Sequence, residues 1–441
     1  MSEIHNQSVG QPAYMLRCLK CEATYAADPF RLHCDADHEP SLLRAIYANQ
    51  TLEVKPHLPG IFQFIDWLPV ETCLNLSGKP ITYASHVLAN YLGLERLFIS
   101  FNGYWQERNA NLLTCSFKEL EAPSVLGRVP SNHSQTLVIA SAGNTGRAFA
   151  NVCSQLEMPL CLVIPESSLS AIWSSQPFHP NVKLIVVGGK GDYSDAIALG
   201  KIISQMDGFF PEGGAANVAR RDGMGITVLD AVVSIGQIPD HYFQAVGSGT
   251  GGISAWEANL RFLADGRFGN HKMKLHLAQN APFTPMVDAW NAGLRELPST
   301  HELVAREQIQ QVSAHVLTNR HPAYGLIGGV YDALRDTQGK MYGITNAQSD
   351  RARCLFEELE GIDICPASGV ATAALLQAVE MGTVKRDDCI LLNITSGGTQ
   401  QIQREHPMHY LRPWRSFLPD EIRPDLVADR MGEFCHVAAP L

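Results

Sequence analysis

A lysine at position 118 has the sequence surroundings of a reactive amine. It follows a small hydroxyl residue and an aromatic residue, Ser116 and Phe117, and residues 119–122 have the pattern of a helix start. A lysine held at such a junction is partly desolvated, so its pKa falls and its nitrogen can attack an aldehyde carbon to form a Schiff base. The same tripeptide also suits an ordinary strand-to-helix junction with a solvated lysine, because such short strings recur by chance. Three later segments decide between these interpretations.

The first segment, residues 140–147, places Ser141, Asn144 and Thr145 between a predicted strand and a predicted helix. Backbone N–H groups and small hydroxyls at a helix start form an anion site, and ligands of α/β sheets bind beyond the carboxyl ends of strands. Asn144 can donate to a phenolate oxygen, while Ser141 and Thr145 can hold a carboxylate. The simpler interpretation is a tight turn with Thr145 as a helix cap, which the run of small and polar residues disfavours.

The second segment is a glycine-rich loop, again between a predicted strand and a predicted helix. Its residues are Gly247, Ser248, Gly249, Thr250, Gly251 and Gly252. Glycines let the backbone approach a phosphate closely and supply several N–H donors. Dinucleotide sites use similar loops, but no suitably placed acidic residue follows a first strand near the start of this chain. We therefore expect a phosphate site and discount a nicotinamide cofactor.

The third segment, residues 392–399, also ends a predicted strand and contains Thr395 and Ser396. A hydroxyl at this position could face a pyridine nitrogen. A neutral partner leaves that nitrogen largely unprotonated and weakens the ring as an electron sink, which favours elimination and replacement over transamination. The alternative is a turn that is rich in glycine for steric reasons.

A group of thiols and an imidazole near the N-terminus has the spacing of a metal site. Cys18 and Cys21 form a Cys-x2-Cys pair, and Cys34 and His38 form a Cys-x3-His pair. Thiolate and imidazole ligands at such spacing suit tetrahedral zinc. The alternative is a ribbon-shaped segment that has lost its metal. In either case we expect a structural unit distant from the chemistry.

Alternating strands and helices must position these residues. Predicted strands are Thr136–Ala140, Leu160–Ile164, Lys183–Val187, Tyr242–Val246, Lys274–Ala278 and Ile390–Ile394, with a shorter one at Leu97–Ile99. Predicted helices are Thr82–Leu94, Thr145–Gln155, Asp192–Met206, Gly223–Ile235, Gly251–Leu263, Gly325–Thr337 and Gly369–Glu380. This alternation predicts an α/β protein with largely parallel sheets. Residues 280–320 show no clear strand or helix pattern, so we expect a loop-rich insertion there.

Composition narrows the class of protein. The chain has 441 residues, of which 45% are hydrophobic and 18% charged, so it is globular and long enough for two or three domains. A net charge of -10 argues against a nucleic-acid partner. No apolar run is long enough to span a membrane, and the N-terminus lacks a secretion signal. The 11 cysteines are scattered and odd in number, which favours reduced thiols and a cytoplasmic location.

The order of the four segments resembles that in fold-type II pyridoxal-phosphate enzymes, and within them the threonine synthase branch. The N-terminal Cys18-x2-Cys21 and the runs at 191–196 and 362–371 support this branch. Glu119-Leu120 stands where threonine synthases usually have Asp-Arg, and Cys365 replaces their usual carboxylate. The run 118–122 and the phosphate loop through Ala258 are more similar to cysteate synthases.

The resemblance implies a fold and a domain division. The fold is two doubly wound parallel-sheet domains with an N-terminal zinc-ribbon-like segment. The expected divisions are a leader at 1–14, the zinc-ribbon-like segment at 15–47, a large cofactor domain at 48–124 and 213–441, and a small substrate-closing domain at 125–212. The group commonly forms homodimers.

The resemblance also implies roles for the residues of the four segments. Lys118 carries pyridoxal 5′-phosphate and moves the α-proton, Asn144 contacts the cofactor's 3-oxygen, and Thr395 or Ser396 faces the ring nitrogen. Backbone amides of Gly247, Ser248, Gly249, Thr250 and Gly251 hold the cofactor phosphate, and Ser141, Asn144, Thr145 and Arg147 bind the substrate. Cations expected beside the anionic groups are drawn from Arg147, Lys190, Arg220 and Arg221.

The reaction implied is a β-replacement that converts the amino-acid phosphate ester O-phospho-L-serine and the small anion sulfite to L-cysteate and phosphate. The first alternative is a threonine synthase acting on O-phosphohomoserine, or a serine or threonine dehydratase. The second is a non-catalytic relative kept for binding, which the intact lysine and loops disfavour.

Overall fold

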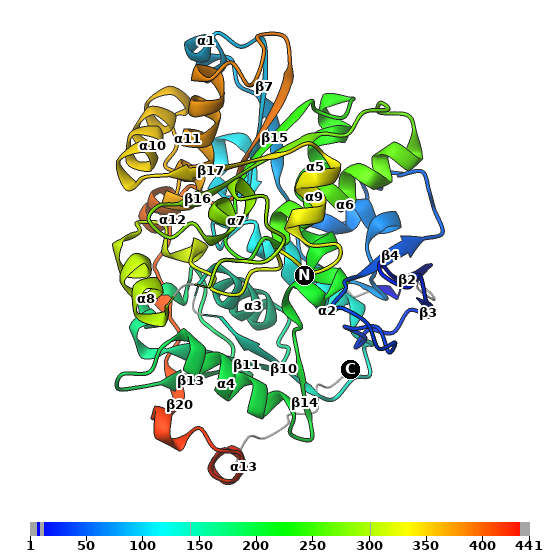
Figure 1. Ribbon diagram of the computed structural model, residues 1–441. Helices are drawn as coiled ribbons and strands as arrows, with labels where there is room; N and C mark the ends of the chain where they lie inside the picture. The colour runs from blue at the N-terminus through cyan, green and yellow to red at the C-terminus, as the bar shows by residue number, and fades with distance from the viewer. Residues whose placement is uncertain (1–6, 9–12, 142, 300, 433–441) are drawn as a thin grey trace.

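Two β-sheets surrounded by helices make up most of the protein (Figure 1). The computed structural model describes residues 7–8, 13–141, 143–299 and 301–432. The larger sheet has the strand order β17-β16-β15-β18-β7-β6, and only its edge strand β6 is antiparallel to its neighbour. These strands are β6 Ile81–Ala84, β7 Arg96–Phe101, β15 His241–Ala245, β16 Lys274–Asn280, β17 Lys340–Ile344 and β18 Cys389–Ile394.

The smaller sheet is fully parallel, with the order β14-β10-β11-β13-β20. Its strands are β10 Thr136–Ala140, β11 Leu160–Pro165, β13 Val182–Val187, β14 Phe209–Pro211 and β20 Pro413–Phe417. Every residue of β11 is buried, as expected for a parallel strand covered by helices on both faces. Helices α3, Asn144–Gln155, and α4, Tyr193–Ser204, provide that cover.

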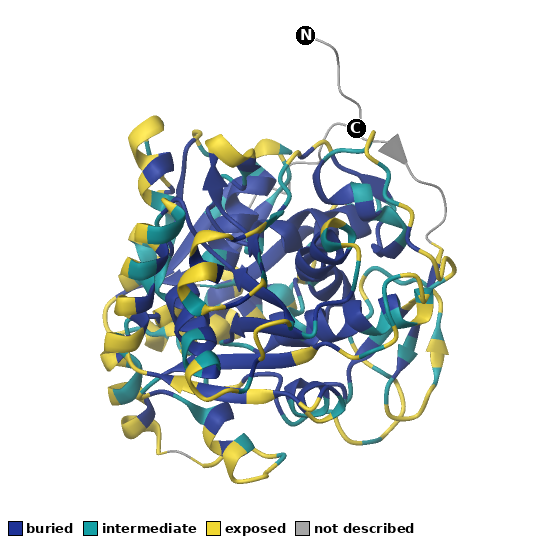
Figure 2. Ribbon diagram, turned by 90° about the horizontal axis from the view of Figure 1, so that it is seen from above, coloured by how far each residue is buried: buried dark blue, intermediate teal, exposed yellow. Residues whose placement is uncertain are grey.

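Helices also cover both faces of the larger sheet. Helix α11, Pro366–Glu380, packs on one face with α10, Asn346–Glu360, outside it, and α5, Val218–Ile235, and α6, Thr250–Asp265, pack on the other. Helix α2, Lys118–Arg128, contacts both α5 and α3 and therefore lies between the two sheets. Seen from above, buried segments fill the centre of the molecule (Figure 2).

The N-terminal segment is a three-stranded antiparallel sheet with the order β3-β2-β4. Its strands are β2 Tyr14–Cys18, β3 Thr24–Tyr25 and β4 Leu43–Tyr47. It is tied to the helices between the two sheets, because Nε of Arg128 donates to the hydroxyl of Tyr14 over 3.1 Å and the guanidinium of Arg221 donates to the carbonyl of Leu43. Most of the expected leader, 1–14, lies outside the described residues.

The remaining strands and α-helices of the described chain are short. They are the strands β1 Gln7–Ser8, β5 Thr72–Cys73, β8 Tyr104–Trp105, β9 Ala110–Asn111, β12 Trp173–Ser174 and β19 His409–Tyr410, and the helices α1 Val87–Leu92, α7 Pro285–Asn291, α8 Glu302–Gln311, α9 Val330–Asp336, α12 Thr399–Glu405 and α13 Pro424–Met431. Within the described ranges, no helix has the length and apolar character needed to span a bilayer.

Two expectations from the sequence are wrong. The helix predicted over Thr82–Leu94 begins as the edge strand β6, because pairing with β7 overrides the local spacing, and only α1 is helical. The C-terminal tail, which the expected division assigns to the large domain as part of 213–441, adds β20 to the smaller sheet beside β13, and α13 packs on α4. A pairing so distant in sequence leaves no local signal.

Candidate active site and metal cluster

Lys118, the predicted reactive lysine, is the first residue of α2. The backbone N–H of Phe117 donates to the carbonyl oxygen of Thr395 over 2.9 Å. Thr395 directly follows β18, and β18 lies between β7 and β15. This hydrogen bond therefore places Lys118 beside the third predicted segment.

The amine of Lys118 is largely withdrawn from water. Its side chain is 16% exposed, and Nζ lies 3.3 Å from Oε2 of Glu121 and 3.7 Å from the sulfur of Met224. Burial lowers the pKa of Lys118, while the charge of Glu121 opposes this effect and that of Arg220 adds to it. The structure thus supports a desolvated lysine and not the solvated one of the alternative interpretation.

The glycine-rich loop connects β15 to α6 at the same edge of the sheet. Gly249 has φ of +82°, the hydroxyls of Ser248 and Thr250 lie 2.9 Å apart, and no side chain caps the start of α6. The N-cap residue of α6 provides no side-chain acceptor, although the N–H of Thr250 donates to Oγ of Ser248 over 3.4 Å. A phosphate is a group that such a turn accepts. A Cβ on Gly247 would lie 2.9 Å from Cα of Leu317, so this position requires glycine.

The first predicted segment, residues 140–147, is called the asparagine segment below. It leads from the carboxyl end of β10 in the smaller sheet into α3. Ala142 lies outside the described residues. Oδ1 of Asn144 accepts a hydrogen bond from Nη2 of Arg147 over 2.7 Å, which leaves its Nδ2 as the group that can donate to a cofactor oxygen. Oγ1 of Thr145 accepts from Nη2 of Arg220 over 3.2 Å. No side chain caps α3 either, so this turn also suits an anion.

Thr395 and Ser396 are both buried, and their backbone is firmly held. The carbonyl of Ser396 accepts from Oγ of Ser368 over 2.8 Å and from the N–H of Cys365 over 3.1 Å. The end of β18 is therefore fixed beside the start of α11, where Cys365 is the N-cap residue and Ser368 lies in the first turn.

Arg147 was expected to bind the substrate. In the structure its guanidinium makes its contacts with other groups of the protein. It donates to the carbonyl of Thr114 over 3.0 and 3.2 Å and to that of Ala171 over 3.3 Å, and it lies 4.4 Å from the ring of Trp173. These contacts hold the segment before Lys118 and the side chain of Asn144. The structure therefore favours a positioning role for Arg147 over substrate contact.

The other candidate cations differ in their surroundings. Arg220 donates to Oε2 of Glu212 over 2.6 Å and its Nε lies 3.3 Å from Oε2 of Glu121. Arg221 is fully buried, where Nε donates to Glu257 over 3.0 Å. Lys190 is exposed. Of the four candidates, Arg220 is thus the one linked both to the lysine helix and to Thr145.

Glu121 was not singled out from the sequence, although its position gave a signal. It follows Lys118 by three residues, and residues three apart lie on the same face of a helix. If α2 is helical from its first residue, Lys118, the carboxylate of Glu121 must lie beside the lysine side chain.

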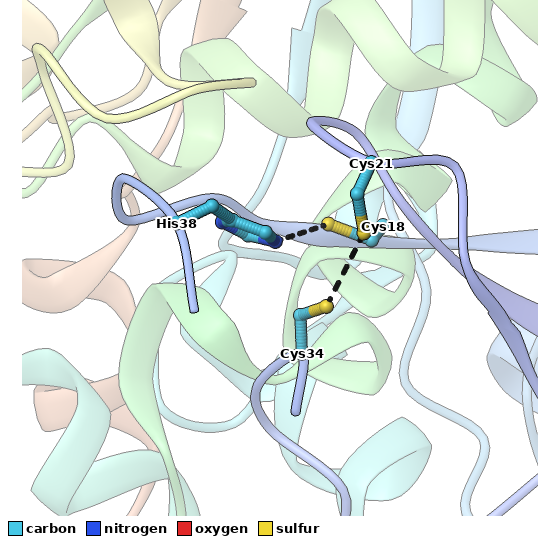
Figure 3. A group of neighbouring side chains, drawn as sticks. All are labelled: Cys18, Cys21, Cys34 and His38. Atoms are coloured by element: carbon cyan, nitrogen blue, oxygen red, sulfur yellow. Dashed lines mark hydrogen bonds between the residues drawn. The ribbon is translucent and has the colours of Figure 1, made fainter. Parts of the chain in front are cut away.

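The four predicted metal ligands gather at the N-terminal sheet (Figure 3). The ligand atoms of Cys18, Cys21, Cys34 and His38 all lie within 4.8 Å of one another. Sγ of Cys18 is 3.3 Å from Nε2 of His38, and Sγ of Cys21 is 3.6 Å from Sγ of Cys34. Ligands about 2.0 to 2.3 Å from a tetrahedral zinc would stand at similar mutual distances. The donor set and its geometry therefore fit zinc.

Known proteins match this chain over most of its length. The family model described as "Pyridoxal-phosphate dependent enzyme" matches residues 100–396. The cysteate synthase of Methanosarcina mazei is 50% identical over 401 residues, which cover 91% of this chain and 95% of that protein. The cysteate synthase of Methanosphaerula palustris is 48% identical over 421 residues, which cover 94% of this chain and 97% of that protein.

Solved structures support the fold. Threonine synthase from Escherichia coli is similar with a TM-score of 0.55 and 12% identity, covering 78% of this chain and 79% of that one. Maize serine racemase is similar with a TM-score of 0.53 and 14% identity, covering 74% and 91%. At these identities the similarity concerns the fold alone. The sequence matches go further: the chain belongs to the pyridoxal-phosphate-dependent enzymes and, among them, to the cysteate synthases.

Proposed function

We propose that this protein is a pyridoxal 5′-phosphate-dependent synthase that converts O-phospho-L-serine and sulfite to L-cysteate and phosphate. The observation that carries the proposal is the identity of 50% with a cysteate synthase along 95% of that protein. The buried amine of Lys118 beside the carboxyl edge of the larger sheet supports it. No observation favours the threonine synthase or dehydratase alternatives.

The cofactor site consists of groups that fit pyridoxal phosphate. Lys118 would bond to its aldehyde, Nδ2 of Asn144 would donate to its 3-oxygen, and Thr395, or else Ser396, would face its ring nitrogen. The phosphate would lie on the backbone amides of residues 247–251, where the start of α6 has no capping side chain. When bound, the cofactor supplies an electron sink that makes the α-proton of an amino acid acidic.

Lys118 is the residue that moves the proton. The free Nζ of Lys118 would lie in a desolvated position where burial lowers its pKa, which suits a general base. It accepts the proton from the α-carbon and becomes an ammonium. The short link from Phe117 to Thr395 keeps Nζ at the edge of the sheet where that carbon must lie.

The asparagine segment would bind the substrate carboxylate. Ser141 and Thr145 supply hydroxyls, and the first turn of α3 supplies N–H groups and a partial positive charge. Arg147 would act indirectly, since its guanidinium already orients Asn144 and holds the carbonyl of Thr114.

Arg220 is the cation that we assign to the phosphate that leaves and to the sulfite that replaces it. Its side chain is 11% exposed, and Nη2 reaches Oγ1 of Thr145 in the carboxylate segment. A guanidinium presents a planar fork of donors that matches phosphate oxygens. Removing water from the site strengthens this attraction.

We also propose that Cys18, Cys21, Cys34 and His38 bind a structural zinc ion. The closed set of three thiols and one imidazole leaves no position for a substrate. A homodimer and a cytoplasmic location, both expected from the sequence, remain predictions that light scattering and cell fractionation test.

Phosphate release from O-phosphoserine, with and without sulfite, tests the function. We expect the purified, cofactor-loaded protein to release phosphate and form cysteate only when sulfite is present, and the Lys118→Ala variant to do neither. O-phosphohomoserine serves as the competing substrate. Formation of threonine from it, or phosphate release independent of sulfite, would refute the proposal in favour of a lyase.

A further inference from the structure

The carboxylate of Glu121 lies between two cations of the site. Its Oε2 is 3.3 Å from Nζ of Lys118 and also 3.3 Å from Nε of Arg220. Arg220 in turn donates to Glu212 over 2.6 Å and to Oγ1 of Thr145 over 3.2 Å. One oxygen of Glu121 thus connects the lysine to the cation that we assign to the leaving phosphate.

Glu121 has few other partners. Its side chain is 0% exposed, and Oε1 has no hydrogen-bond partner among the described residues. A buried carboxylate oxygen without a hydrogen bond costs free energy. The neighbouring Glu119 shows how a buried carboxylate is normally satisfied, since its Oε2 accepts the N–H of Thr114 over 2.7 Å. The charge of Glu121 is therefore directed at Lys118 and Arg220 and contributes little to the backbone.

The charges near Lys118 balance only when its amine is protonated. The groups whose charges act on it are Glu121, Arg220 and Glu212, one cation against two carboxylates. A neutral lysine leaves a net charge of -1 in this buried group, whereas an ammonium brings it to zero. These carboxylates therefore favour the form that the lysine takes after accepting a proton and oppose the effect of burial.

We propose that Glu121 is a positioning residue that serves as the counter-ion of Lys118 during the proton transfer. The proposal rests on the proposed function. As the bond between the α-carbon and its hydrogen breaks, the electron pair stays with the substrate and the proton passes to Nζ of Lys118. The new ammonium then pairs with Oε2 of Glu121, which already holds Arg220.

Two measurable rates change in opposite directions when this charge is removed. Without Glu121 the lysine is a weaker base, so proton removal slows. The same lysine is less protonated at neutral pH, so its nitrogen attacks an aldehyde faster. A neighbouring opposite charge commonly shifts a pKa by about one or more, so each rate changes about ten-fold.

The first measurement uses cofactor-loaded, full-length protein in heavy water and follows exchange of the α-proton of L-serine by NMR. The second uses the full-length protein stripped of cofactor, with pyridoxal added and the bond to Lys118 fixed by borohydride and counted by mass spectrometry. For Glu121→Gln we expect exchange about ten-fold slower and labelling about ten-fold faster than in the wild type.

Glu119→Gln is the matched control, because it alters a buried carboxylate two residues away that does not touch Nζ. We expect it to lower the melting temperature and to leave both rates within a factor of about two. Glu121→Asp, which keeps the charge, restores part of the exchange and provides a second variant should Glu121→Gln fold poorly.

The outcomes separate this inference from the proposed function. If the wild type neither exchanges the proton nor becomes labelled at Lys118, the proposed function fails. If the wild type does both and Glu121→Gln matches it, or if both rates fall together, the counter-ion role is refuted.

Discussion

The hydroxyl of Thr145 accepts a hydrogen bond from Nη2 of Arg220 at 3.2 Å, and this contact joins the helices of the two sheets. Thr145 lies in the first turn of α3, which follows β10, whereas Arg220 lies in the first turn of α5, which covers the larger sheet. The proposed carboxylate site and the proposed phosphate site are thus in direct contact.

Replacing Arg220 by lysine should weaken binding of O-phosphoserine. Lysine keeps the charge but lacks the guanidinium fork and cannot contact Thr145 and Glu212 together. We expect the KM for O-phosphoserine to rise about ten-fold to a hundred-fold with a smaller change in kcat. Steady-state phosphate release at varied substrate measures both. The exposed Lys190→Ala variant is the control, and an unchanged KM in Arg220→Lys would remove Arg220 from the phosphate site.

Gly247→Ala should displace the glycine-rich loop that we propose as the phosphate loop. The added Cβ would lie 2.9 Å from Cα of Leu317 and 3.0 Å from the carbonyl oxygen of Val316, and backbone atoms cannot move aside cheaply. We expect the Kd for pyridoxal phosphate to rise about ten-fold by absorbance titration, because the loop amides lose their alignment. Gly225→Ala is the control: its Cβ meets nothing closer than 3.6 Å, so cofactor affinity should not change.

Removing the metal from the Cys and His cluster should affect the candidate active site, although none of the four metal ligands contacts that site in the part of the chain that the structure describes. Cys18 pairs with Leu43 in the N-terminal sheet, and the carbonyl of Leu43 accepts from the guanidinium of Arg221, next to Arg220. We expect Cys21→Ser to lose zinc, to melt at a lower temperature and to lose activity. Elemental analysis, calorimetry and phosphate release measure these three effects.

The exposed, unpaired Cys354 gives the matching control, because Cys354→Ser removes a thiol outside the cluster. It should keep its zinc and its activity. Full activity in a zinc-free Cys21→Ser protein would show that the N-terminal sheet does not support the site.

Local sequence signals predicted much of the fold and the site. Strands β10, β15 and β18 are short, largely buried runs rich in apolar or aromatic residues, and each leads into small and polar residues, so their loops could be recognised without a structure. Parallel strands then bring such loops to one edge of a sheet. The Cys-x2-Cys and Cys-x3-His spacings at the N-terminus were also a local signal, and the structure brings the four side chains together.

Contacts between distant segments were not predictable. Arg147 has the sequence position of a substrate ligand, yet its guanidinium donates hydrogen bonds to the carbonyls of Thr114 and Ala171. Strand β20 joins the smaller sheet across more than 200 residues of sequence, a separation with no periodic signature. In both cases, tertiary packing determined the outcome.

A buried chain of hydrogen bonds crosses the larger sheet at the start of β15, the end opposite the phosphate loop. Oδ2 of Asp388 lies 3.0 Å from Nε2 of His241, Nδ1 of His241 lies 2.8 Å from Nε2 of His276, and Nδ1 of His276 lies 2.8 Å from the hydroxyl of Tyr342. The carboxylate only accepts, so His241 donates to it, His276 donates to His241, and Tyr342 donates to His276. Both imidazoles are neutral in this arrangement.

This chain should make stability depend on pH. Burial, with added repulsion from His241, Lys340 and Lys274, lowers the pKa of His276 to about 3. An unfolded histidine has a pKa of about 6.5, so the unfolded chain takes up the proton first as pH falls. The stability is fully present above about pH 6.5 and is lost as pH falls toward about 3, by about 1.4 kcal/mol for each pH unit.

Urea unfolding between pH 7.5 and 4.5 measures this loss, and His276→Gln isolates it. Glutamine offers one donor for His241 and one acceptor for Tyr342, so it keeps the chain of hydrogen bonds while removing the titrating group. We expect a shallower fall of the free energy of unfolding in His276→Gln than in the wild type, and an unchanged fall in a variant of the exposed His86. Equal slopes in the wild type and His276→Gln would mean that the proton is taken up elsewhere, because a neutral imidazole forced to charge in this buried position cannot leave stability unaltered.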